Sequence, residues 1–92
     1  MPQIFKVGSY LIYFWSNENK PVEPIHIHVS QGVPSENATK IWITRAGGCL
    51  LCHNNSKIPL RKLRYIMDIA EARHTEIEEK WLSYFKEIRF YC

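Results

Sequence analysis

The hydrophobic spacing of the sequence changes once, at Pro59, and this change limits the folds that the chain can adopt. Before Pro59, apolar residues alternate with polar ones or form short β-branched runs, which is typical of strands. After Pro59, they recur every three or four positions, which is typical of amphipathic helices. The 92 residues, 46% of them hydrophobic, suffice for one core. We therefore predict a single α+β domain over residues 1–92, with strands at about 4–53 and helices at about 59–89.

The first part of the chain divides into five short segments with strand character. Gly8 and Ser9 fit the two-residue turn of a hairpin, because glycine tolerates a positive φ angle. The segment after this turn is apolar or aromatic on both faces, which indicates a central strand covered on each side. We expect a small, largely antiparallel sheet with strands at residues 4–7, 10–15, 25–30, 39–44 and 49–53.

Two helices are predicted after Pro59, a residue that suits the first turn of a helix. Thr75 and Glu78 have the spacing of a capping box that would open the second helix. Because a chain of this length offers the apolar stripes no other partner, both helices are expected to pack on one face of the sheet. The stripes are Leu60, Leu63, Ile66, Met67 and Ala70 in the first helix and Ile77, Trp81, Tyr84, Phe85 and Ile88 in the second.

His26 and His28 are the most informative functional feature of the sequence. They alternate with β-branched residues, so both side chains should point to one face of a strand while Ile27 points into the core. Two neutral imidazoles can act as general acid and base, or they can bind a metal. A structural role is the alternative, with one ring hydrogen-bonded to a loop and the other in solvent. We name His26 and His28 as candidate catalytic residues and expect no cofactor.

The motif Cys49-Leu50-Leu51-Cys52-His53 has the spacing of a c-type haem attachment site. Haem attachment requires export, and the N-terminus lacks the features of a signal peptide. Structural zinc is also disfavoured, because Cys49 and Cys52 would point to opposite faces of an extended strand. We expect two buried thiols that behave as small hydrophobic residues, and no metal site.

Four cationic residues lie where the first helix should begin. Positive charges at this position oppose the helix dipole, whereas anions are favoured there. The cluster is a candidate site for a phosphate, for an RNA backbone or for an acidic partner protein, and the alternative is a solvated helix face. The net charge of +3 permits an acidic partner without requiring one. The cluster consists of Lys57, Arg61, Lys62 and Arg64.

The histidine strand also carries a resemblance to a known family. An aromatic run ending in Ser-Asn-Glu at residues 16–18 precedes Pro-Ile-His-Ile-His-Val at residues 24–29. Lys-Ile-Trp at residues 40–42, Leu-Arg-Tyr-Ile at 63–66 and Trp-Leu-Ser-Tyr-Phe at 81–85 follow. Over nearly the whole chain these segments resemble the short bacterial proteins catalogued as domain of unknown function 4160. The usual family pattern is Pro-Pro-His-x-His, and Ile25 replaces its second proline here.

The resemblance implies a bacterial protein with a small cognate partner protein, because members are often encoded in pairs that look like toxin–antitoxin modules. A toxin role would make RNA the expected target. His26 and His28 would then cleave the phosphodiester without a metal, and Arg61 and Arg64 would position the phosphate. The alternatives are a non-enzymatic interaction or regulatory module and a histidine-based metal-binding domain. We expect a cytoplasmic protein. We expect no membrane contact, because no apolar run is long enough to span a bilayer. A homo-oligomer is compatible with the sequence.

Overall fold

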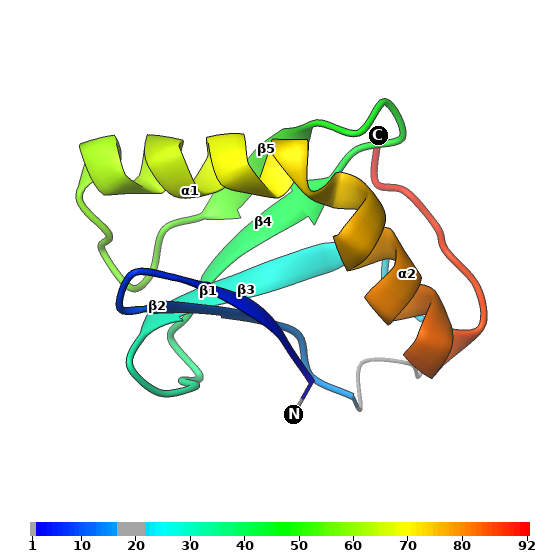
Figure 1. The fold of residues 1–92 in the computed structure, drawn as a ribbon, viewed down its shortest axis with the longest axis horizontal. Coiled ribbons are helices and arrows are strands. Elements are labelled where there is room, and N and C mark those ends of the chain that lie inside the picture. Colours follow the sequence, from blue (N-terminus) through cyan, green and yellow to red (C-terminus); the bar gives the residue numbers. More distant parts are fainter. Residues whose placement is uncertain (1, 17–21) are drawn as a thin grey trace.

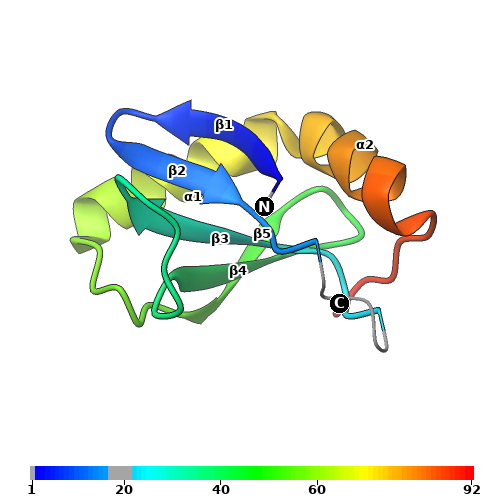
Figure 2. The same cartoon turned by 90° about the horizontal axis from the view of Figure 1, so that it is seen from below.

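A five-stranded antiparallel sheet with two helices on one face forms the fold (Figure 1). The computed structural model describes residues 2–16 and 22–92. The α+β class and the position of both helices on one face of the sheet are confirmed (Figure 2). The strands lie side by side in chain order, β1 (Gln3–Val7), β2 (Tyr10–Tyr13), β3 (His26–Gln31), β4 (Thr39–Ile43) and β5 (Cys49–His53), and are followed by α1 (Leu60–Ala72) and α2 (His74–Phe85).

The main core lies between the sheet and the helices and follows the alternation of the strands. Ile27 of β3 and Ile41 of β4 are fully buried there, together with Trp81 of α2. Two residues of the predicted helical stripes are exposed instead. Leu60 is the first residue of α1, where the helix has not yet covered the sheet, and Tyr84 places its ring edge-on against Phe14 at the rim.

The opposite face of the sheet, which we call the outer face, carries Tyr13, His28, Lys40 and Trp42. Neither α1 nor α2 covers this face (Figure 2). The loop after β3 folds over one part of it. The Tyr13 hydroxyl donates to the Ser35 carbonyl at 3.2 Å and accepts from the Ser35 backbone N–H at 3.1 Å. This loop buries Tyr13 fully, so β2 is covered on both faces, as its sequence indicates.

The start of α2 differs from the prediction, because the capping box at Thr75 and Glu78 does not form. The helix begins at His74, and its N-cap residue Arg73 makes no capping bond through its side chain. The Arg73 guanidinium instead donates to the Glu76 carboxylate at 2.8 Å, and His74 Nδ1 lies 3.1 Å from a Glu78 oxygen. Carboxylates in the first turns of a helix interact favourably with its dipole. These two glutamates therefore stabilise the helix start without a Thr75 cap.

The segment after α2 returns to the sheet. The Ile25 backbone N–H donates to the Arg89 carbonyl at 2.8 Å, and the Arg45 N–H donates to the Cys92 carbonyl at 2.9 Å. These bonds hold residues 86–92 beside the ends of β3 and β4, although the segment is not itself a strand. As a result, the Tyr91 ring stacks on the Trp42 ring of the outer face, with 4.8 Å between centroids and 5° between planes.

Candidate functional site

The imidazole rings of His26 and His28 lie next to each other at the start of β3. Their centroids are 4.9 Å apart and their planes are nearly perpendicular, at 86°. This arrangement follows from the strand geometry, because residues i and i+2 share a face. Their accessibility differs, since His26 is fully buried and His28 is partly exposed. The two histidines are therefore not equivalent chemically.

His26 is enclosed on all sides by protein. Its Nδ1 atom lies 2.9 Å from the Pro24 carbonyl oxygen, which can only accept, so Nδ1 carries a proton and donates it to this bond. The pairing of β2 with β3 ends at Tyr13, two residues short of His26. Beyond that point, the His26 ring contacts Trp42 at 5.6 Å and Trp81 of α2 at 5.3 Å. These contacts connect the start of β3 to α2, which is a structural role.

His28 belongs to an aromatic surface with one ion pair beside it. Its ring centroid lies 5.6 Å from that of Tyr13 and 6.4 Å from that of Trp15. Across the strand it pairs with Lys40, whose Nζ lies 3.0 Å from a Glu23 oxygen and 4.5 Å from the centroid of the Trp42 ring. Because Glu23 pairs with Lys40, the described residues around His28 form a predominantly aromatic surface.

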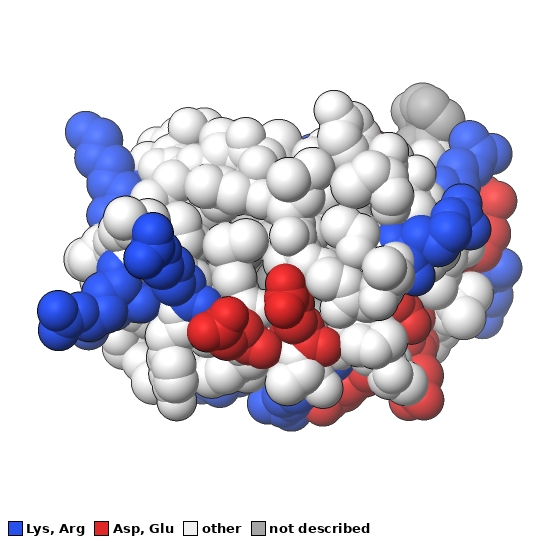
Figure 3. Space-filling view, turned by 90° about the horizontal axis from the view of Figure 1, so that it is seen from above, with Lys and Arg blue, Asp and Glu red and all other residues white. Residues whose placement is uncertain are grey.

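The structure does not bring the predicted cationic residues to the histidines. Arg61, Lys62 and Arg64 lie in the first half of α1, and Lys57 precedes it. Figure 3 shows Lys and Arg side chains gathered at the end of the molecule where α1 begins. The helix packs on the sheet face that carries Ile27, whereas His28 points to the outer face. The sheet therefore separates the two groups of predicted site residues.

The two cysteines of β5 differ in environment, and the expectation that both are buried is wrong, because Cys52 is exposed and Cys49 is half-buried. Lys40 pairs with His53 and Ile41 with Leu51, so Cys52 is the extra residue of a β-bulge and is exposed. Cys49 lies beneath α1, where burial, reinforced by the negative charges of nearby Glu71 and Asp68, raises its pKa to about 12.

No metal centre is formed by the part of the chain that the structure describes. Within residues 2–16 and 22–92, no three histidine, cysteine, aspartate or glutamate side chains gather in an arrangement that could hold a metal ion. None of the helices in these ranges is long and apolar enough to cross a membrane.

The raised pKa of Cys49 predicts a selective reactivity with alkylating reagents. At pH 8 only about one Cys49 thiol in ten thousand is ionised when the pKa is about 12, and the thiolate is the reactive form. We expect iodoacetamide at pH 8 to modify the exposed Cys52 and Cys92 first, which peptide mass spectrometry over time would show. In urea, Cys49 should react as fast as the others, and fast modification of Cys49 in the folded protein would contradict its placement.

The predicted site residues omit two aromatic residues of the outer face, Trp42 and Tyr91. The alternation of β4 places Trp42 on the same face as Lys40, and this signal could have identified it. Tyr91 lies in a segment without strand or helix periodicity, so only the return of the chain to the sheet reveals its position.

The comparisons with known proteins agree with the resemblance seen in the sequence. A family model described as Domain of unknown function (DUF4160) matches residues 9–82, from the turn after β1 to the second half of α2. No curated protein matches the chain, and no solved structure matches it. The segment that the family model matches includes the histidine strand and α1. Because this segment makes up most of the chain, the protein belongs to the DUF4160 family.

Proposed function

We propose that the protein is one component of a toxin–antitoxin-like pair and binds a small partner protein through its outer face, without catalysing a reaction. The separation of the candidate groups carries the non-catalytic part of this proposal, and the family resemblance implies the small partner protein. His28 lies on the outer face, the cationic residues lie on α1 across the sheet, and His26 is fully buried. A phosphodiesterase that used both histidines with Arg61 and Arg64 would need all four groups around one phosphate.

The composition of the outer face supports protein binding. Aromatic side chains are enriched in the centres of protein interfaces, and Trp15, Trp42 and Tyr91 are all partly or largely exposed. Tyr91 is 60% exposed and is stacked on Trp42, so the pair presents a preorganised surface that loses little entropy on binding. Among the described residues of the outer face, the charge of Lys40 is paired with Glu23, so we expect the partner surface that contacts these residues to be apolar or aromatic.

A binding measurement with the small protein encoded beside this one, the partner that the family resemblance implies, tests this proposal. By isothermal titration calorimetry, Trp42→Ala and Tyr91→Ala should each weaken the complex about tenfold or more, as expected for aromatic hot-spot residues. Leu82→Ala is the matched control, because Leu82 is an exposed apolar residue of α2, away from the outer face. Equal losses for all three variants, or no complex at all, would overturn the proposal.

Expression without the adjacent gene separates binding from RNA cleavage. A non-catalytic component should leave the growth and the total RNA of the host unchanged, both for the wild type and for His28→Ala. If the wild type arrested growth with RNA fragmentation and His28→Ala relieved both effects, His28 would be catalytic and the non-enzymatic proposal would fail. His28 is the appropriate position, because substitution of the buried His26 also affects folding.

A further inference from the structure

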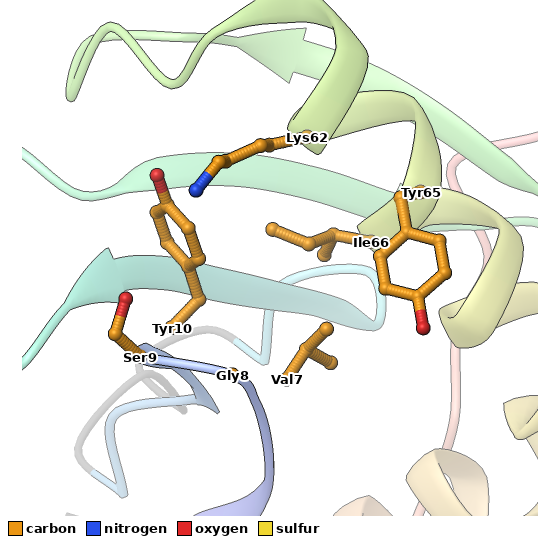
Figure 4. Close-up of a pocket in the computed structure, with 7 residues that line it drawn as sticks. All are labelled: Val7, Gly8, Ser9, Tyr10, Lys62, Tyr65 and Ile66. Carbon is orange, nitrogen blue, oxygen red and sulfur yellow. The ribbon is translucent and has the colours of Figure 1, made fainter.

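A pocket opens between the β1–β2 turn and α1, on the helix side of the sheet (Figure 4). Its volume is about 270 Å³. Val7 and Ile66 line it with apolar groups, and the Tyr65 ring stands at its side. A second hollow of about 380 Å³ adjoins the first at Tyr10 and reaches Lys57 and the start of α1. The first hollow is therefore mainly apolar, whereas the second is more polar and borders the cationic Lys57.

The start of α1 has an unusual excess of positive charge. Its N-cap residue, Pro59, provides no capping side chain, and the first turn has no acidic residue. Leu63 is the first helical residue whose N–H reaches the Pro59 carbonyl, so earlier N–H groups have no acceptor within the helix. Among the described residues, no carboxylate forms an ion pair with Lys57 or Lys62. A bound anion would be attracted both by the helix dipole and by these ammonium groups.

Tyr10 provides an independent observation that points to a ligand. Tyr10 borders both hollows and is only 8% exposed. Its hydroxyl forms no hydrogen bond with another described residue, and it is not one of the fully enclosed polar atoms, so it opens onto the hollows. Lys62 Nζ lies 5.9 Å from the centroid of the Tyr10 ring, and Figure 4 shows the hydroxyl and the ammonium at the same end of the pocket. A nearly buried phenol that faces a cavity is placed to bond with whatever occupies the cavity.

We propose that this pocket binds a small phosphomonoester that carries a planar group, as a nucleoside monophosphate does. The phosphate accepts hydrogen bonds from the Lys62 ammonium and from the Tyr10 hydroxyl, and Lys57 lines the adjoining hollow. The planar group lies against Val7, Ile66 and the Tyr65 ring. A phosphate is favoured because it has more acceptor atoms than a carboxylate for this number of donors. The site lies across the sheet from the outer face and is independent of the proposed function.

Titrations with three probes test the pocket in the full chain. Adenosine monophosphate, inorganic phosphate and adenosine are added to the ¹⁵N-labelled protein, and amide shifts are followed by NMR. Adenosine monophosphate should shift the amides of Ser9, Tyr10 and Lys62. Inorganic phosphate should act more weakly at the same positions, and adenosine should bind about tenfold or more weakly than the monophosphate, because a charge-assisted hydrogen bond contributes at least this factor.

Substitutions distinguish specific binding in the pocket from non-specific attraction of the phosphate to a basic surface. Lys62→Gln should weaken adenosine monophosphate binding about tenfold and Tyr10→Phe about fivefold, consistent with the loss of hydrogen bonds to a charged group. Lys80→Gln is the matched control on α2 and should change the affinity less than about twofold, because Lys80 lines neither hollow and exposed charges are screened by salt. The proposal is overturned by the absence of shifts with all three probes, by equal binding of adenosine and its monophosphate, or by an equal loss in Lys80→Gln and Lys62→Gln.

Discussion

Replacing Trp81 with alanine is expected to lower the free energy of unfolding by about 4 kcal/mol, the typical cost of removing a large buried aromatic side chain. Trp81 is fully buried under α2. Its ring contacts Phe85 at 4.4 Å, Phe14 at 5.0 Å and His26 at 5.3 Å between centroids. Because a domain of this kind is stable by only about 5–15 kcal/mol, the variant should be close to unfolding at 37 °C.

Urea denaturation followed by circular dichroism measures this loss, with Leu82→Ala as the control on the same helix. Leu82 is 43% exposed, so its truncation should cost less than about 1 kcal/mol. Trp81→Phe should be milder than Trp81→Ala, since phenylalanine keeps most of the ring volume. It also removes an indole N–H that has no acceptor among the described residues, which offsets part of the cost. Similar losses in Trp81→Ala and Leu82→Ala would contradict the packing of α2.

His26→Ala is expected to destabilise the fold by about 3 kcal/mol, whereas His28→Ala should cost about 1 kcal/mol or less. The His26 ring is fully buried between Trp42 and Trp81, and its Nδ1 donates to the Pro24 carbonyl. The alanine variant therefore creates a cavity and leaves that carbonyl without its donor. His28 is partly exposed, so water can replace part of its surroundings.

The same denaturation experiment compares the two histidine variants, and the double variant His26→Ala, Trp81→Ala measures their coupling. Because the two rings are in contact, the combined loss should differ from the sum of the single losses by about 0.5 kcal/mol or more. A smaller cost for His26→Ala than for His28→Ala would show that His26 is not the residue that ties β3 to α2.

Two local patterns of the sequence together determine where the candidate site residues lie relative to one another. The apolar stripe of α1 has to face the apolar side of β3, which carries Ile27. His28 alternates with Ile27 and must therefore point away from α1 and from its cationic residues. The separation of Arg61 and Arg64 from the histidines thus follows from two local patterns considered together. These patterns are incompatible with one catalytic site that contains both histidines and both arginines.

Other features of the site depend on contacts between distant segments. His26 and His28 occupy equivalent positions in the strand pattern, yet only His26 is fully buried. The difference arises because β2 pairing ends beside His28, so that α2 reaches His26 beyond the end of β2. The stacking of Tyr91 on Trp42 likewise requires the chain to return to the sheet after α2. No local periodicity encodes where a neighbouring strand stops or where a loop returns.

The sequence by itself determined the five strands, the two helices and the shared face of His26 and His28, because periodicity is a local property of neighbouring residues. It also carried enough family signal over residues 9–82 to identify the family. Only the tertiary structure decided which histidine is buried and that Tyr10 meets Lys62 at one pocket. These outcomes depend on how elements far apart in the chain pack against one another, since packing must fill space without voids and local spacing does not specify it.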